Sequence, residues 1–230
     1  VVLSTEVFEE FMAENDLYSL AVSGRSDEEI LKSFVAARLP EHIYQDLGTI
    51  ILQARHPLAI RSSSKLEDSY YQPFAGIYNT YMIPIVPVKS LAIRMLETAI
   101  KCVYASVFFR ASKAYASATS NLIDEEKMGI IIQEVCGTQH NDRFYPTLSG
   151  VARSINFYPI RPEKPHDGIA TVAFGLGKLI AEGGTGLRFS PKYPQKIIQL
   201  STPELALRST QKYFYALDMN PDRFVPSPDD

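Results

Sequence analysis

The sequence contains little cysteine: only Cys102 and Cys136 occur among its 230 residues. Two cysteines make neither a disulfide framework nor a cysteine-based zinc site. This scarcity favours a reduced protein in the cytoplasm. Cys136 ends an apolar run, which favours a buried and unreactive thiol.

Long hydrophobic runs are also missing. No apolar stretch approaches the roughly 18 residues that a membrane-spanning helix needs, and the apolar run at 82–88 contains two prolines. The first ten residues carry acidic side chains where a secretory signal would carry lysines. We therefore expect no membrane segment and no targeting signal.

Charge of one sign is not concentrated anywhere in the chain. The 23 lysines and arginines and the 26 aspartates and glutamates give a net charge of −3 and a pI of about 5.9. A nucleic-acid-binding domain would instead show a clustered basic surface. The four histidines have no metal-ligand spacing, and no serine lies in a Gly-x-Ser-x-Gly motif. We expect no nucleic-acid partner and no metal ligand within the chain.

The size and composition suit a globular protein. Hydrophobic residues make up 46% of the chain, enough for a sizeable core in one domain of two lobes or in two small domains. The chain begins with valine rather than methionine, and residues 221–230 form a proline- and aspartate-rich run that is typical of a linker. We therefore expect a fragment of a longer protein.

The first half of the chain is predicted to be mainly helical. Residues 5–47 have a helical pattern, in which Ser26 and Glu29 have the spacing of a capping box. A short apolar run at 57–60 predicts a buried strand that ends beside Arg61. Residues 62–80 are predicted to form a loop, with a possible strand at 77–82. Apolar residues recur every four positions across 89–118, which predicts one long helix.

The second half is richer in strands. Dense β-branched residues predict a buried strand at 128–136, and further strands are predicted at 149–158 and 169–174. The glycines of 175–177 then lead into a short helix. The order predicts an α+β fold in two lobes. We expect a helical region with the first lobe at 1–125, a strand-rich second lobe at 126–190, and a C-terminal segment and linker at 191–230.

Arg61 is the first residue whose position suggests chemistry. It follows a core strand and begins a polar stretch, and its planar guanidinium suits phosphate oxygens. The alternative is a structural arginine that pairs with Glu67 or Asp68. Ser63 and Lys65 nearby could bind phosphate, or they could cap a turn and extend into solvent.

Two glycine-containing segments could also approach a ligand closely. The first is Phe74-Ala75-Gly76, followed by Thr80. The second is Gly175-Leu176-Gly177 at a strand-to-helix junction, where free N–H groups favour anions. It is not a Gly-x-Gly-x-x-Gly motif, because Ile180 stands at the third position. It is not a Walker motif either, because no serine or threonine follows Lys178.

Taken together and in this order, the motifs resemble the N-terminal nucleotide-binding domain of the phosphoenolpyruvate synthase and pyruvate, phosphate dikinase family. That family combines an arginine followed by serines, an acidic pair, Phe-Ala-Gly and a threonine. A later helix has Tyr104 where the family has tryptophan. The sequence IIIQEVC resembles the strand and hinge that hold adenine, and the motifs Ser-Gly-Val at 149–151 and Gly-Leu-Gly at 175–177 follow. The similarity covers about residues 1–190.

The resemblance implies an ATP-grasp fold with ATP lying between two lobes. It implies that Arg61 contacts the phosphates as the catalytic residue, that the loop from Gly76 to Thr80 covers them, and that backbone groups of 134–136 hold adenine. The nucleotide-contacting residues that it implies are Arg61, Ser63, Lys65, Gly76, Thr80, Gln133, Glu134, Val135, Cys136, Gly175 and Gly177. In the family, phosphate passes from ATP to a carrier histidine on a separate domain and then to pyruvate, normally with Mg²⁺.

The chain also departs from the family pattern. A glycine-rich segment with a phosphate-binding lysine would precede Val1, and the family's Asp-x-Glu pair for Mg²⁺ followed by Gln-x-Arg does not occur in 190–230. Lys178 replaces the family's glutamate. The carrier-histidine domain and the pyruvate-binding barrel would be partners in the parent protein, so we expect this chain alone to be inactive. The alternatives are a related dikinase with another acceptor, such as an antibiotic or a glucan, and a degenerate nucleotide-binding module.

Overall fold

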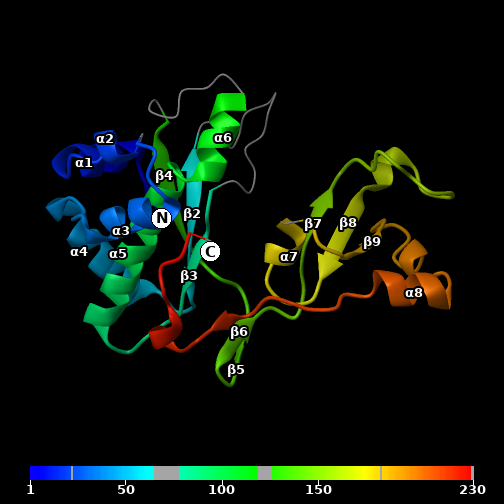
Figure 1. Cartoon of the computed structure of the whole chain (residues 1–230). Coiled ribbons are helices and arrows are strands. Elements are labelled where there is room, and N and C mark those ends of the chain that lie inside the picture. Colours follow the sequence, from blue (N-terminus) through cyan, green and yellow to red (C-terminus); the bar gives the residue numbers. More distant parts are fainter. Residues whose placement is uncertain (22, 65–77, 119–125, 182, 229–230) are drawn as a thin grey trace. The chain divides into compact units, whose positions relative to one another are not determined.

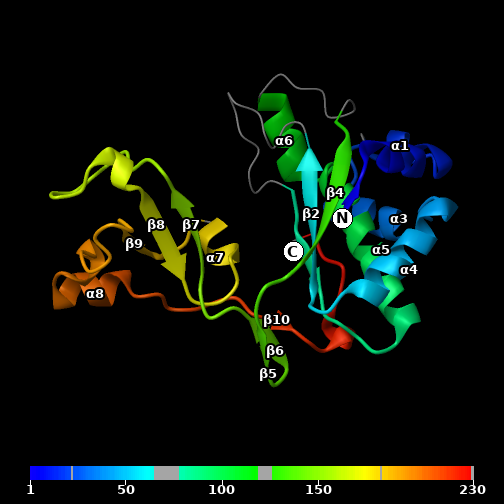
Figure 2. The same cartoon turned by 180° about the vertical axis from the view of Figure 1, so that it is seen from behind.

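The computed structural model describes residues 1–21, 23–64, 78–118, 126–181 and 183–228. The chain divides into two compact units (Figures 1 and 2). Unit 1 comprises Val1–Val135 and Met219–Asp230, and unit 2 comprises Cys136–Asp218. Helices and strands both contribute to the fold, as the sequence predicted. None of the described helices is long and apolar enough to cross a membrane.

The division falls ten residues later than the 125/126 boundary that we expected, because the strand at 128–134 belongs to unit 1. This strand, β4 (Met128–Glu134), pairs antiparallel with β2 (Leu58–Ser64) along their whole lengths, from Leu58 opposite Glu134 to Ser64 opposite Met128. The remaining strands of the sheet are β1 (Val2–Leu3) beside β4 and β3 (Tyr81–Ile83) beside β2. The prediction of a loop from residue 62 onward was wrong for 62–64, because the three serines continue the ladder with β4.

Helices form the rest of unit 1. They are α1 (Thr5–Glu14), α2 (Tyr18–Ala21), α3 (Asp27–Ala36), α4 (Tyr44–Gln53), α5 (Lys89–Ser106) and α6 (Arg110–Ala118), and a 3₁₀ turn at Glu41–Ile43 precedes α4. In both views α1, α3, α4 and α5 lie on the same side of the sheet (Figures 1 and 2). The predicted capping box begins α3: the Ser26 hydroxyl accepts from the Glu29 N–H, and the Glu29 carboxylate accepts from the Ser26 N–H.

The predicted helix at 89–118 is two helices, because the chain turns at 107–109. Val107, Phe108 and Phe109 are all buried, and their N–H groups donate to carbonyls three residues back. At these three positions the hydrogen bonds of a tight turn replace the pattern of an α-helix, in which each N–H donates to the carbonyl four residues back. The Asp27 carboxylate then accepts from the N–H of Arg110, which begins α6.

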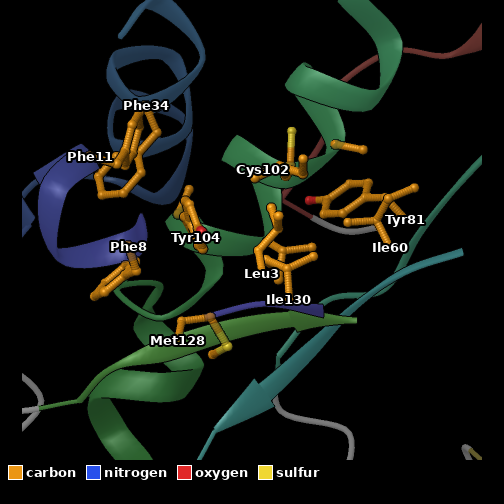
Figure 3. Close-up of a cluster of buried hydrophobic side chains, with 14 of the residues drawn as sticks. Leu3, Phe8, Phe11, Phe34, Ile60, Tyr81, Cys102, Tyr104, Met128 and Ile130 are labelled. Carbon is orange, nitrogen blue, oxygen red and sulfur yellow. The ribbon is translucent and has the colours of Figure 1, made fainter. Parts of the chain in front are cut away.

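Aromatic side chains fill the core between the helices and the sheet (Figure 3). Tyr104 is fully buried, with its ring centroid 5.0 Å from that of Phe8 and 5.5 Å from that of Phe11. Leu3, Met128 and Ile130 contribute from the sheet. This cluster fixes which face of β2 and β4 points toward the helices.

The end of the chain, which the sequence predicted to be a linker, packs back onto unit 1. The Tyr81 hydroxyl donates to the Ser227 carbonyl, and the Asn79 amide donates to the Pro228 carbonyl. Phe224, which follows a 3₁₀ turn at Pro221–Arg223, packs against the core. A proline-rich segment has few N–H groups to satisfy, so side-chain donors to its carbonyls are enough to hold it.

Unit 2 contains two small antiparallel sheets. One consists of β10 (Leu217–Asp218), β6 (Arg143–Tyr145) and β5 (Thr138–His140), in that order, and the other of β7 (Ser149–Arg153), β8 (Ile169–Ala173) and β9 (Leu187–Phe189). The helices are α7 (Lys178–Ala181) and α8 (Pro203–Ser209), and 3₁₀ turns lie at Pro165–Asp167 and Ile198–Leu200. The predicted strand at 169–174 is confirmed, and the one predicted at 149–158 ends at Arg153 because the chain then leaves the ladder with β8.

Candidate functional site

The face of β2 and β4 that points away from the core brings several predicted site residues together. Leu58 and Ile60 of β2 and Met128, Ile130 and Ile132 of β4 point into the core. Side chains of a strand alternate between its two faces, so the intervening positions share the other face. We call this the second face of unit 1, and its residues in β2 and β4 are Ala59, Arg61, Ser63, Gly129, Ile131 and Gln133.

Arg61 occupies the middle of the second face. It lies opposite Ile131, between the pairs Ala59–Gln133 and Ser63–Gly129. Its side chain is exposed, and within the part of the chain that the structure describes it has no hydrogen bond and no ion pair. Its expected alternative partners, Glu67 and Asp68, lie outside the described residues. The guanidinium is thus held by a rigid strand, with its donors directed to no described acceptor.

Ser63 and Thr80 lie near Arg61. Ser63 is two residues further along β2 and half-buried, and a Cβ on its partner Gly129 would lie 3.1 Å from the Ser63 carbonyl oxygen. Thr80 directly precedes Tyr81, which pairs with Ile60, the neighbour of Arg61. Strand pairing therefore brings two hydroxyls to the strand segment that carries the arginine. Lys65 and Gly76, the other predicted phosphate contacts of this region, lie outside the described residues.

The end of β4 carries the residues that the resemblance assigns to adenine. Gln133 is exposed on the second face, opposite Ala59. The Glu134 carboxylate accepts from the N–H groups of Arg55 and His56. These two hydrogen bonds lower the pKa of the Glu134 carboxyl below its ordinary value, and the one from Arg55 has the larger effect. Glu134 therefore ties the end of β4 to the loop before β2.

Val135 and Cys136 differ in whether their backbone N–H groups already donate a hydrogen bond to a described residue. The Val135 N–H donates to the Pro57 carbonyl at 2.8 Å, so this donor is already used. The Cys136 N–H has no acceptor among the described residues. The prediction that the Cys136 side chain is buried was wrong, because the thiol is exposed: β4 ends at Glu134, and the chain leaves the core there.

The predicted glycine turn of unit 2 forms as expected between β8 and α7. Gly175 has φ +87°, and a Cβ there would lie 2.8 Å from the Tyr215 carbonyl oxygen. The Leu176 N–H donates to that same oxygen at 2.9 Å. The turn therefore requires glycine for both its conformation and its close packing. The ammonium of Lys178, at the start of α7, lies 5.6 Å from the centre of the Tyr215 ring.

The described residues do not form a metal site. Within 1–21, 23–64, 78–118, 126–181 and 183–228, no three His, Cys, Asp or Glu side chains gather closely enough to hold an ion. The donor set on the second face is also unsuitable, because it consists of a guanidinium, a hydroxyl and an amide rather than carboxylates.

Comparison with known proteins identifies the family. Residues 1–211 match the family model described as pyruvate phosphate dikinase, AMP/ATP-binding domain. The chain belongs to this family. The match covers both the second face of unit 1 and the glycine turn of unit 2, so the pyruvate phosphate dikinase family resemblance that the motifs carried is confirmed.

A curated relative of low sequence identity supports the same family assignment. The chain is 24% identical over 185 residues to the "Uncharacterized phosphotransferase YvkC" of Bacillus subtilis (strain 168), which corresponds to 79% of this chain and 20% of that protein. The chain thus spans about a fifth of the length of this relative. The part of the pyruvate phosphate dikinase family that this chain matches is the AMP/ATP-binding domain.

Sequence reasoning missed the residues that frame the site. Gly129 and Ile131 flank Ser63 and Arg61 across the ladder, but they looked like ordinary members of a buried strand. Gly129 and Gln133 were a signal, because a glycine and a polar residue interrupt the apolar run on the same face of the strand, whereas Ile131 matches its core neighbours and gave none. Their place beside Arg61 depends on the register of two strands about seventy residues apart.

Proposed function

We propose that the second face of unit 1 binds ATP, with Arg61 contacting the phosphates. The chain would be the nucleotide-binding part of a multidomain phosphotransferase. In that enzyme, phosphate would pass from ATP to a carrier histidine and then to pyruvate, giving phosphoenolpyruvate. The observation that carries the proposal is the position of Arg61: exposed, fixed on a central strand, and without a partner among the described residues.

The arginine has a physical reason to bind phosphate. A guanidinium presents several N–H donors in one plane, which match two phosphate oxygens at once. A hydrogen bond to a charged group contributes roughly 1.5–3 kcal/mol, and here no described carboxylate competes for it. Since β2 is paired on both sides, by β3 and β4, the backbone that carries the arginine is already ordered, and binding costs only the freedom of the side chain.

The other predicted contacts are arranged around this anchor. In the proposal, Ser63 and Thr80 donate their hydroxyls to the phosphates, and Gln133 lies toward the adenine end of β4. The N–H of Cys136 is the hinge donor that we assign to adenine, because that of Val135 already donates to Pro57. The Glu134 carboxylate holds the loop before β2 and so acts on the shape of the site.

The finer parts of the proposal rest on the family resemblance. These are the ATP-grasp arrangement and the contribution of backbone N–H groups at Gly175 and Gly177. Mg²⁺ would neutralise phosphate charge in such a reaction, but the described residues offer no ligand set for it. No step of the proposal therefore passes through a metal ion, and we propose that its ligands belong to the parent protein, outside this chain. We also propose that this chain does not transfer phosphate by itself.

Calorimetric titration of a non-hydrolysable ATP analogue tests the role of Arg61. We expect Arg61→Gln to weaken binding by about tenfold or more, the equivalent of one charged hydrogen bond. Arg94→Gln is the matched control, because Arg94 is an exposed arginine of unit 1 on α5, in the helical layer. Equal affinities of the Arg61→Gln variant and the parent chain would refute the assignment of the phosphates to Arg61.

A further inference from the structure

A second candidate ligand site lies on the sheet of unit 2 formed by β7, β8 and β9. A pocket of about 320 Å³ opens on this sheet and on the segment that follows β7. This volume lies at the lower end of the range of small-molecule sites. The lining includes Arg153, Phe157, Tyr158, Ile169, Thr171 and Arg188.

Strand register places the two arginines of the pocket on the same face. Arg153 of β7 lies opposite Ile169 of β8, and Arg188 of β9 lies opposite Thr171 of β8. Ile169 and Thr171 are two residues apart and therefore point to the same side of the sheet. The guanidinium groups thus approach the pocket from the two outer strands, across the central strand β8.

A fully buried polar side chain holds one of these arginines. Asn156 is 0% exposed, and its carbonyl oxygen accepts from the Arg188 guanidinium at 3.3 Å and from the Tyr158 N–H at 3.1 Å. Its amide nitrogen donates to the Glu163 carboxylate at 3.0 Å. Asn156 therefore holds Arg188 and the segment that carries the two aromatic residues, and its amide group links the Arg188 guanidinium to the Glu163 carboxylate.

The pocket has an unbalanced positive charge. Its lining includes two arginines and no aspartate or glutamate. In the described part of the chain, neither Arg153 nor Arg188 forms an ion pair with a carboxylate. Two guanidinium groups facing one small pocket repel each other, and an anion between them removes that repulsion.

The lining also includes two strongly exposed aromatic side chains. Phe157 is 70% exposed and Tyr158 is 77% exposed. Consecutive aromatic side chains left in water beside a pocket are typical of binding surfaces. An aromatic ring on a ligand would cover them and gain stacking as well as burial.

We propose that this pocket binds a small organic anion with a planar apolar body. Arg153 and Arg188 hold the anionic group, and Phe157 and Tyr158 contact the ring. The proposal does not depend on the ATP site, because it involves none of the residues of the second face of unit 1.

Phenyl phosphate is a suitable probe, because it combines the two features. We expect it to bind the 230-residue chain at a single site by ligand-observed NMR titration. Inorganic phosphate and phenol, which each carry one feature, are expected to bind at least about tenfold more weakly. No detectable binding of phenyl phosphate at millimolar concentration, or equal binding of phenol, would overturn the proposal.

Variants then locate the probe. Arg153→Gln and Arg188→Gln should each weaken phenyl phosphate binding by about tenfold or more, and Phe157→Ala should weaken phenyl phosphate but not inorganic phosphate. Arg208→Gln is the matched control, because Arg208 is an exposed arginine of unit 2 outside the pocket. Melting curves followed by circular dichroism confirm that each variant is folded.

Two further results would contradict the assignment. One is unchanged affinity in both pocket arginine variants. The other is loss of phenyl phosphate binding in Arg61→Gln, which would place the probe at the proposed nucleotide site. Failure of the ATP proposal would instead show as unchanged ATP affinity in Arg61→Gln, so the two proposals fail in different measurements.

Discussion

The two units bury their hydrophobic side chains to very different extents. The core cluster of aromatic and aliphatic residues lies wholly in unit 1, from Leu3 to Ile132 (Figure 3). Unit 2 buries few large apolar side chains, mainly Phe144, Leu176 and Leu179, and most of the exposed large hydrophobic residues belong to it. Its fully buried side chains include the polar Asn156 and Ser190. Unit 1 is therefore stabilised chiefly by apolar burial, and unit 2 depends more on glycine turns and hydrogen bonds.

The two cysteines give the largest expected contrast. Cys102 is buried in unit 1, and burial raises the pKa of its thiol to about 12. Cys136, the first residue of unit 2, is exposed. Labelling by a thiol reagent at pH 8 should modify Cys136 at least roughly a thousandfold faster, because Cys102 becomes accessible only when unit 1 opens. Mass spectrometry of the labelled chain measures both rates. Similar rates would show that unit 1 opens readily and that its core does not protect Cys102.

Truncation of one aromatic residue in each unit should give the next largest difference. Tyr104→Ala removes a fully buried ring from unit 1 and should lower the free energy of unfolding by about 3–5 kcal/mol. Phe214→Ala removes a ring of unit 2 that is 42% exposed and should cost about half as much. Urea unfolding followed by circular dichroism measures both.

Tyr104→Phe is the control for this pair. The Tyr104 hydroxyl is buried without a hydrogen-bond partner among the described residues, so its removal should be neutral or stabilising by up to about 1 kcal/mol. A large loss of stability in Tyr104→Phe would show that the hydroxyl has a partner and that the core of unit 1 is not purely apolar here.

The sequence was sufficient for features that depend on local patterns. The capping box at Ser26 and the glycine turn at 175–177 formed where they were predicted, and the strand predicted at 128–136 formed over Met128–Glu134. The helix break at 107–109 was not predictable, because it accompanies packing of Phe108 against Phe8 of α1 and Phe34 of α3, which are distant in the sequence. The strand through Ser64 was missed because serine is common in loops, whereas pairing with β4 decided its structure.

The residues of the candidate site remain predictions from sequence motifs, and the structure adds how they are arranged. Arg61, Ser63 and Gln133 were chosen from motifs, but their place on one face follows from the register of β2 and β4. The N–H of Cys136, which has no acceptor among the described residues, could not be distinguished from that of Val135, because only the structure shows the contact of Val135 with Pro57.

The glycine turn of unit 2 should be sensitive to a single methyl group. Gly175→Ala forces a side chain into φ +87° with backbone and aromatic atoms closer than 3 Å, and we expect a cost of roughly 2 kcal/mol or more. Gly183→Ala is the matched control, because Gly183 has φ +74° with no described atom within 4 Å of the new methyl. The melting temperature should fall clearly more in Gly175→Ala than in Gly183→Ala. Equal effects would mean that backbone conformation alone, and not packing against Phe214 and Tyr215, requires the glycine.

The smallest expected effect is a dependence of unit 2 on pH. The Asp167 carboxylate accepts a hydrogen bond from the Lys192 ammonium, which has the larger effect, and one from the Lys164 N–H. These hydrogen bonds lower the pKa of the Asp167 carboxyl below the ordinary 3.8. A lowered folded-state pKa stabilises the protein above pH 3.8, and this contribution is lost as the pH falls below that value. Asp167→Asn should therefore reduce the loss of stability between about pH 4 and pH 2. Melting temperatures across this range measure it, and a parallel pH profile in the variant would contradict the assignment.

Photolabelling with 8-azido-ATP tests the central claim most directly, because it shows which part of the chain lies beside the nucleotide. We predict an adduct on a peptide that contains residues 133–136, abolished by excess ATP and strongly reduced in Arg61→Gln but not in Arg94→Gln. An adduct confined to α3, α4 or α5, or one that excess ATP does not prevent, would contradict the placement of ATP on the second face of unit 1.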